Sequence, residues 1–244
     1  MSLRIGFDMD GVLADFAAEY HAVEERLFGP AAATTRAGDP EEEEEGRREK
    51  EEGTREKEEG TEAEPVAATA RELRRRRDVV WQAILATPDF WTTLKPTEDG
   101  AVRRIHAMML KHRWEVFFIT QRPETDGDTV QRQTQRWLVE QGFDLPSVLV
   151  IGGSRGAAAG ALRLNYHVDD SPKNCIDVKS ESGARPLLIL GGEQPDETLT
   201  AAARRLRVGT AATIGAALDI LEQATIVHTQ PPLLGRLARL IGWQ

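Results

Sequence analysis

The sequence predicts an α/β fold: a parallel five-stranded sheet with helices on both faces and a small helical segment inserted after the first strand. Two observations predict it. Short runs that are apolar almost throughout, as in parallel sheets covered on both faces, recur along the chain. The segments between them carry apolar residues at helical spacing. The expected strands are about 3–8, 115–119, 147–151, 164–169 and 186–190.

The first strand ends in two carboxylates, Asp8 and Asp10, which Gly11 follows. Ile5 and Phe7 predict a buried strand, and the glycine predicts the turn that ends it. Open α/β sheets bind their ligands at the carboxyl ends of the strands. Two acids at this edge repel each other unless a cation or a shared proton compensates them. A hard divalent ion such as Mg²⁺, which takes oxygen ligands, is therefore expected here.

Three more apolar runs end in polar side chains suited to phosphate or metal. They are Thr120 with Gln121, Arg155 in a glycine-rich loop, and the pair Asp169-Asp170. Acids, a hydroxyl and a basic residue at four strand ends are the parts that magnesium-dependent phosphoryl transfer needs. Arg122 follows Gln121, and the sequence leaves open whether it reaches a phosphate or covers the strand end.

Helical periodicity predicts the elements between the strands, in chain order. A helix over 15–28 stops at Gly29-Pro30, and a second over 66–87 precedes an aromatic turn at 88–91. Three further helices are expected over 99–113, 129–141 and 214–224.

Two segments lie outside this pattern. Residues 36–64 hold a seven-residue repeat without an apolar seam, which excludes a coiled coil and favours a solvated, largely disordered insert over an acidic docking segment. The tail at 229–244 is amphipathic, and we favour docking on the domain or on a second copy over a membrane surface. A homodimer therefore stays open.

Composition narrows the class of protein. The chain has 244 residues and a net charge of −9, but residues 36–64 hold 14 acidic and 6 basic side chains, so the remainder is near neutral. Without a basic surface, a nucleic-acid polymer is not an expected partner. Cys175 is the single cysteine, and we expect it to be inert and packed. With no signal peptide and no apolar stretch near the ~20 residues of a membrane span, we expect a cytoplasmic protein.

The strand-end motifs resemble those of the haloacid dehalogenase superfamily of phosphohydrolases. Asp-Met-Asp-Gly-Val-Leu-Ala-Asp-Phe at 8–16, Phe-Ile-Thr at 118–120 and Val-Asp-Asp-Ser-Pro-Lys-Asn at 168–174 are similar, within it, to the 5′(3′)-deoxyribonucleotidase family. The resemblance covers most of residues 1–224 except the insert. It implies a core domain formed by 1–14 and 96–228, and a small helical cap over 15–95 that carries the insert.

The resemblance also implies roles for the acids. Asp8 would be the nucleophile that forms an aspartyl-phosphate, and Asp10 the acid that protonates the leaving alkoxide and then deprotonates the attacking water. A Mg²⁺ ion would be held by Asp8, the backbone carbonyl of Asp10, Asp169 and Asp170.

Phosphate and substrate contacts complete the implied site. Thr120 and Gln121 would contact phosphoryl oxygens. Arg155 stands where the family has a lysine that neutralises the phosphoaspartate, and Lys173 could share this role. The aromatic residues that would stack on a nucleobase are Phe16, Phe90 and Trp91. Core packing is the competing explanation for all three rings.

The expected function is that of a Mg²⁺-dependent 5′-nucleotidase acting on ribo- or deoxyribonucleoside monophosphates. The first alternative keeps the chemistry and takes a sugar phosphate or another small phosphomonoester. The second, motivated by the acidic insert and by Arg155, is a catalytically silent binding or regulatory protein. A haloalkanoic dehalogenase would need neither Asp10 nor the Asp169-Asp170 pair.

Overall fold

The computed structural model describes residues 2–30, 63–191 and 197–229. The chain divides into two compact units. The first comprises Met1–Asp15, Trp91–Pro123 and Thr129–Gln244, and the second Phe16–Phe90 and Glu124–Asp128. The expected insert, up to residue 62, and the expected tail, beyond residue 229, lie outside the described residues.

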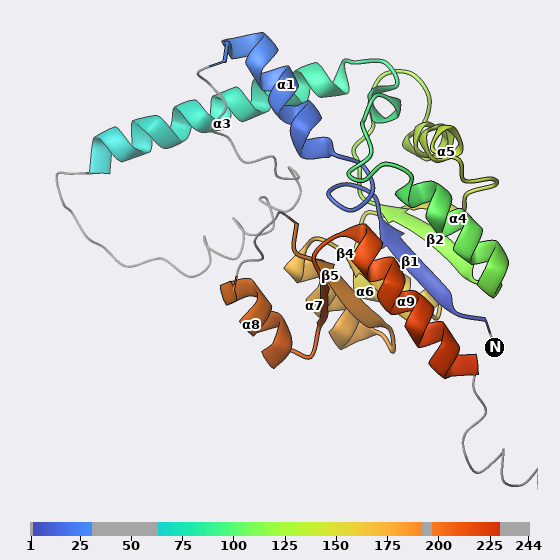
Figure 1. Cartoon of the computed structure of the whole chain (residues 1–244). Coiled ribbons are helices and arrows are strands. Elements are labelled where there is room, and N and C mark those ends of the chain that lie inside the picture. The colour runs from blue at the N-terminus through green and yellow to red at the C-terminus, as the bar shows by residue number, and fades with distance from the viewer. Residues whose placement is uncertain (1, 31–62, 192–196, 230–244) are drawn as a thin grey trace, which may run out of the picture. The chain divides into compact units, whose positions relative to one another are not determined.

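The first unit contains a parallel sheet of six strands in the order β3-β2-β1-β4-β5-β6 (Figure 1). The strands are β1 (Arg4–Asp8), β2 (Glu115–Thr120), β3 (Val148–Val150), β4 (Tyr166–Asp169), β5 (Arg185–Ile189) and β6 (Gly209–Ala211). The expectation of five strands was wrong by one. β6 has three residues, Gly-Thr-Ala, and no apolar run. Backbone pairing with β5, as between Leu188 and Thr210, makes it a strand.

Helices cover both faces of this sheet (Figure 1). Phe118 of β2 packs against Phe7 and Phe143, whereas its neighbour Ile119 belongs to a cluster with Leu164 and Val178, as expected when side chains alternate between faces. The helices are α4 (Ala101–His112), α5 (Val130–Glu140), α6 (Arg155–Ala161), α7 (Pro172–Glu181), α8 (Glu197–Arg205) and α9 (Ile214–Thr229).

The second unit is built on α1 (Phe16–Phe28) and α3 (Ala63–Leu85), which pack against each other. Phe16 stacks on Trp81 with ring centroids 5.5 Å apart, and Tyr20 meets both rings edge on. The short helix η1 (Phe90–Thr92) begins where this unit ends. None of the helices in the described ranges is long and apolar enough to cross a membrane.

The strand order creates a switch point at β1. From β1 the chain reaches β2 on one side, and it later returns to β4 on the other side. Crevices at such switch points, beyond the carboxyl ends of the strands, are where open α/β sheets bind ligands. The candidate residues Asp8 and Asp169 are the last residues of these adjacent strands.

Candidate active site

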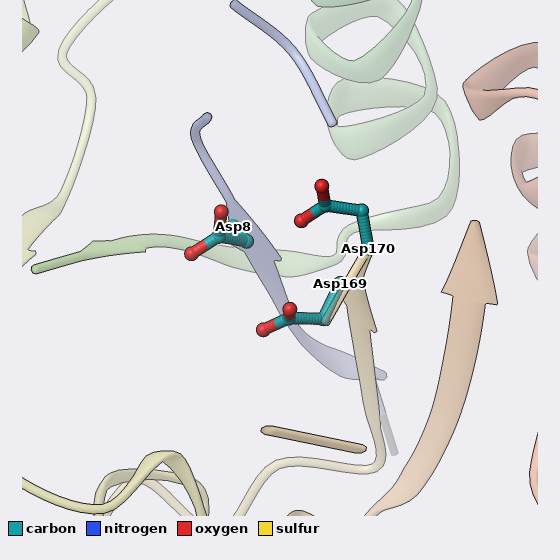
Figure 2. A group of neighbouring side chains, drawn as sticks. All are labelled: Asp8, Asp169 and Asp170. Atoms are coloured by element: carbon teal, nitrogen blue, oxygen red, sulfur yellow. The ribbon is translucent and has the colours of Figure 1, made fainter. Parts of the chain in front are cut away.

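Three carboxylates meet at the switch point. Phe7 of β1 pairs with Val168 of β4, so the next residues, Asp8 and Asp169, end neighbouring strands side by side. Asp170 follows directly, and Figure 2 shows the three side chains projecting from these two strand ends. One oxygen of each carboxylate lies within 4.8 Å of the other two. Asp8 and Asp169 are buried, and Asp170 is exposed.

The turn after β1 allows Asp170 to approach. Gly11 has a φ of 75°, in the left-handed region that glycine adopts without strain. A Cβ atom at this position would lie 2.0 Å from Oδ2 of Asp170, closer than any real contact. Gly11 therefore serves both the backbone conformation and the space that the third carboxylate occupies.

Negative charge is undercompensated in this cluster. Burial raises the pKa of Asp8 well above its usual value, and the carboxylates of Asp169, Asp170 and Asp10 raise it further, against the opposing effect of Arg155. Three carboxylates whose oxygens lie this close together fit a hard divalent cation with oxygen ligands, such as Mg²⁺. The oxygens of Asp8, Asp169 and Asp170 are the ones that would hold it.

Asp169 is fixed by its own surroundings. Its Oδ1 accepts hydrogen bonds from the backbone N–H of Ser171 at 2.9 Å and from Nδ2 of Asn174 at 3.2 Å. Its Oδ2 lies 2.9 Å from Nε2 of the fully buried His167, which donates. A carboxylate held on both oxygens in this way keeps one orientation toward the cluster.

Arg155 places a buried guanidinium beside Asp8. It is the first residue of α6, after Ser154, whose hydroxyl caps the helix by accepting from the backbone N–H of Gly156. One terminal nitrogen of Arg155 donates to Oδ1 of Asp8 at 2.5 Å. Its Nε and its other terminal nitrogen are buried without a hydrogen-bond partner among the described residues. Buried donors without acceptors are costly, so this site suits an anion with several oxygens.

Other expected phosphate contacts lie at nearby strand ends. Thr120 is the last residue of β2 and is buried, one position beyond Ile119, which pairs with Asp8 in the sheet. Gln121 follows it and is half-buried. Lys173 is the second residue of α7 and is exposed.

Asp10 is not one of the three carboxylates that group closely, but its charge still acts on Asp8. Both its carboxylate oxygens accept hydrogen bonds from Arg122, the residue for which the sequence left two roles open. The aromatic residues also have partners. Phe16 and Phe90, in the second unit, meet edge to face, and Trp91, in the first, is buried against Arg122.

Two contributors to the site were not expected from the sequence, His167 and the fork of Arg122 to Asp10. Strand alternation is a signal for the first, because residues two apart on β4 share a face and His167 precedes Asp169 by two. No comparable local signal exists for the second, since Arg122 and Asp10 are 112 residues apart in the chain.

Comparisons with family models and with curated proteins gave no match. Solved structures do resemble the chain. A phosphonoacetaldehyde hydrolase-like protein from Oleispira antarctica is 12% identical with a TM-score of 0.53, covering 95% of this chain and 96% of its own. A haloacid dehalogenase-like family hydrolase from Streptococcus pneumoniae is 12% identical with a TM-score of 0.50, covering 90% and 98%. The chain therefore has the fold of the haloacid dehalogenase-like hydrolases.

Proposed function

We propose that this protein is a Mg²⁺-dependent phosphomonoester hydrolase that works through an aspartyl-phosphate on Asp8. The observation that carries the proposal is Arg155, a buried guanidinium that contacts Asp8 and has further donors unused. A nucleophilic carboxylate and an anion-binding group at one point suit attack on a bound phosphoryl group. When bound, a magnesium ion supplies positive charge that favours the ionised carboxylates and offsets charge on the phosphoryl oxygens.

The reaction has two steps, transfer of the phosphoryl group to Asp8 and hydrolysis of the aspartyl-phosphate. A carboxylate oxygen of Asp8 bonds to phosphorus as the ester P–O bond breaks, and Asp10, acting as the general acid, gives a proton to the leaving alkoxide. Water then attacks phosphorus, Asp10 takes a proton from it, and the bond between phosphorus and Asp8 breaks. Inorganic phosphate leaves, and both aspartates regain their starting states.

For the substrate class we retain two candidates. The motif resemblance favours a nucleoside monophosphate. A sugar phosphate or another small phosphomonoester is equally well supported, because the Trp91 ring is buried and covered by Arg122 on one face. The ratio of kcat/KM values across a panel of nucleotides and sugar phosphates separates the two.

Phosphate release tests the chemistry. Wild-type protein with Mg²⁺ should liberate inorganic phosphate from at least one member of the panel, and excess EDTA should stop it. Asp8→Asn should lower kcat by at least about a thousandfold, since it removes the nucleophile. The matched control is Asp99→Asn, at an exposed aspartate before α4, which should retain wild-type rates.

Two results would contradict the proposal. Full activity of Asp8→Asn would exclude an aspartyl-phosphate intermediate on Asp8. Ligand binding without turnover by the wild type would favour a catalytically silent binding protein.

A further inference from the structure

Asp10 and Arg122 form a two-pronged ion pair beside the candidate nucleophile. Nε of Arg122 donates to Oδ2 of Asp10 at 2.8 Å, and a terminal nitrogen donates to Oδ1 at 2.7 Å. The side chain of Arg122 is 1% exposed, whereas that of Asp10 is 26% exposed. A buried guanidinium thus grips, from one side, a carboxylate that stays open to solvent on the other.

Arg122 is itself immobilised. Its second terminal nitrogen donates to Oγ1 of Thr134 on α5 at 3.0 Å, and its guanidinium carbon lies 4.7 Å from the centre of the Trp91 ring. Trp91 is anchored in turn, because its indole N–H donates to the carbonyl of Pro123 and its backbone N–H to the side chain of Gln133. The planar group is held at its edges and on one face, so it presents a fixed fork.

This arrangement leaves proton-transfer sites on Asp10. Each carboxylate oxygen has two lone pairs, and the fork uses one on each oxygen. The remaining lone pairs are available to a proton on the exposed side. The three carboxylates that would hold the cation are those of Asp8, Asp169 and Asp170.

We propose that Arg122 is a positioning residue that holds Asp10 in the orientation from which it protonates the leaving group. This inference rests on the proposed phosphomonoester hydrolysis. As the ester P–O bond breaks, the Asp10 proton passes to the alkoxide oxygen, and the fork stops the carboxylate from rotating away. Fixed orientation matters because misplacement by about 1 Å can cost about a hundredfold in rate.

The leaving group provides the test. An alkyl phosphate leaves as a strongly basic alkoxide that needs a proton, whereas p-nitrophenyl phosphate leaves as a stable phenolate that needs little help. Arg122→Lys keeps the charge and loses the fork. It should lower kcat/KM for glycerol phosphate by about 10- to 100-fold. The fold-decrease in kcat/KM for p-nitrophenyl phosphate should be at least about tenfold smaller. The ratio kcat/KM reports the step in which the leaving group departs, before the phosphoenzyme is hydrolysed.

A double-mutant cycle shows whether Arg122 acts through Asp10. Once Asp10→Asn has removed the acid, adding Arg122→Lys should lower kcat/KM for glycerol phosphate by less than about twofold. Thr134→Val, which removes only the hydroxyl that steadies the guanidinium, should give a weaker form of the same alkyl-selective loss. This variant carries the test if Arg122→Lys does not fold.

Three outcomes bear on the inference. Alkyl-selective loss together with a non-additive cycle supports it. Equal losses for both esters, or a full extra loss in the Asp10→Asn background, would overturn it and assign Arg122 to phosphate binding instead. Failure of the proposed function looks different, because the wild type would then show no Asp8-dependent release of phosphate from either ester.

Discussion

At the scale of single residues, chemistry at the candidate site depends on which donors and acceptors are left unmatched. Arg155 donates to Asp8 and keeps two buried nitrogens without a hydrogen bond among the described residues, although its Nε lies 3.7 Å from Oδ2 of Asp169. All three nitrogens of Arg122, by contrast, have hydrogen-bond acceptors. An arginine with unused donors suits a ligand, and one with every nitrogen engaged suits a scaffold. The two guanidiniums are therefore suited to different tasks despite their identical chemistry.

This difference predicts how Arg155 tolerates substitution. Arg155→Lys keeps the positive charge beside Asp8 and loses the planar set of guanidinium donors, so we expect kcat to fall by about tenfold. Arg155→Met removes the charge and should cost about 100- to 1,000-fold. Steady-state phosphate release measures both. Near-wild-type activity in Arg155→Met would show that the guanidinium is not needed by the phosphoryl group.

At the scale of elements, the position of Arg155 depends on close packing between α6 and α7. Gly156 is the second residue of α6, and a Cβ atom there would lie 2.2 Å from the backbone carbonyl oxygen of Asp177 on α7. Backbone atoms cannot move aside as a flexible side chain does. The absence of a side chain at Gly156 is thus what lets the helices approach.

Gly156→Ala should therefore destabilise the fold by about 1–3 kcal/mol, although alanine is the better helix former. The matched control is Gly160→Ala on the same helix, whose Cβ would lie 3.5 Å from the nearest atom, an ordinary contact. That variant should gain up to about 1 kcal/mol from helix propensity. Urea unfolding measures both, and equal effects would show that helix contact does not decide the cost.

At the scale of the whole molecule, the candidate site destabilises the folded protein when no cation is bound. Burial and three neighbouring carboxylates disfavour ionised Asp8, and only Arg155 counters them. Folding without a cation therefore buries charge at a cost. A cation that binds only the folded protein adds stability through its binding free energy.

Thermal unfolding can test this balance. In EDTA at neutral pH, Asp8→Asn should unfold at a higher temperature than the wild type. Because the pKa of Asp8 is raised on folding, its stabilising contribution is present below the usual value of 3.8 and is lost as pH rises. The advantage of the variant should therefore shrink toward low pH. Mg²⁺ should raise the unfolding temperature of the wild type more than that of Asp8→Asn. If Asp8→Asn unfolded at a lower temperature than the wild type at every pH, this explanation would be wrong.

The sequence by itself determined the parallel α/β architecture and the polar residues at the strand ends, because hydrophobic periodicity and turn residues are local signals. It did not reveal β6, whose three residues become a strand only through pairing with β5. Only the tertiary structure decided which side chains meet. Arg155 reaches Asp8 across 147 residues and Arg122 reaches Asp10 across 112, since strand order and helix packing, rather than local sequence, set these distances.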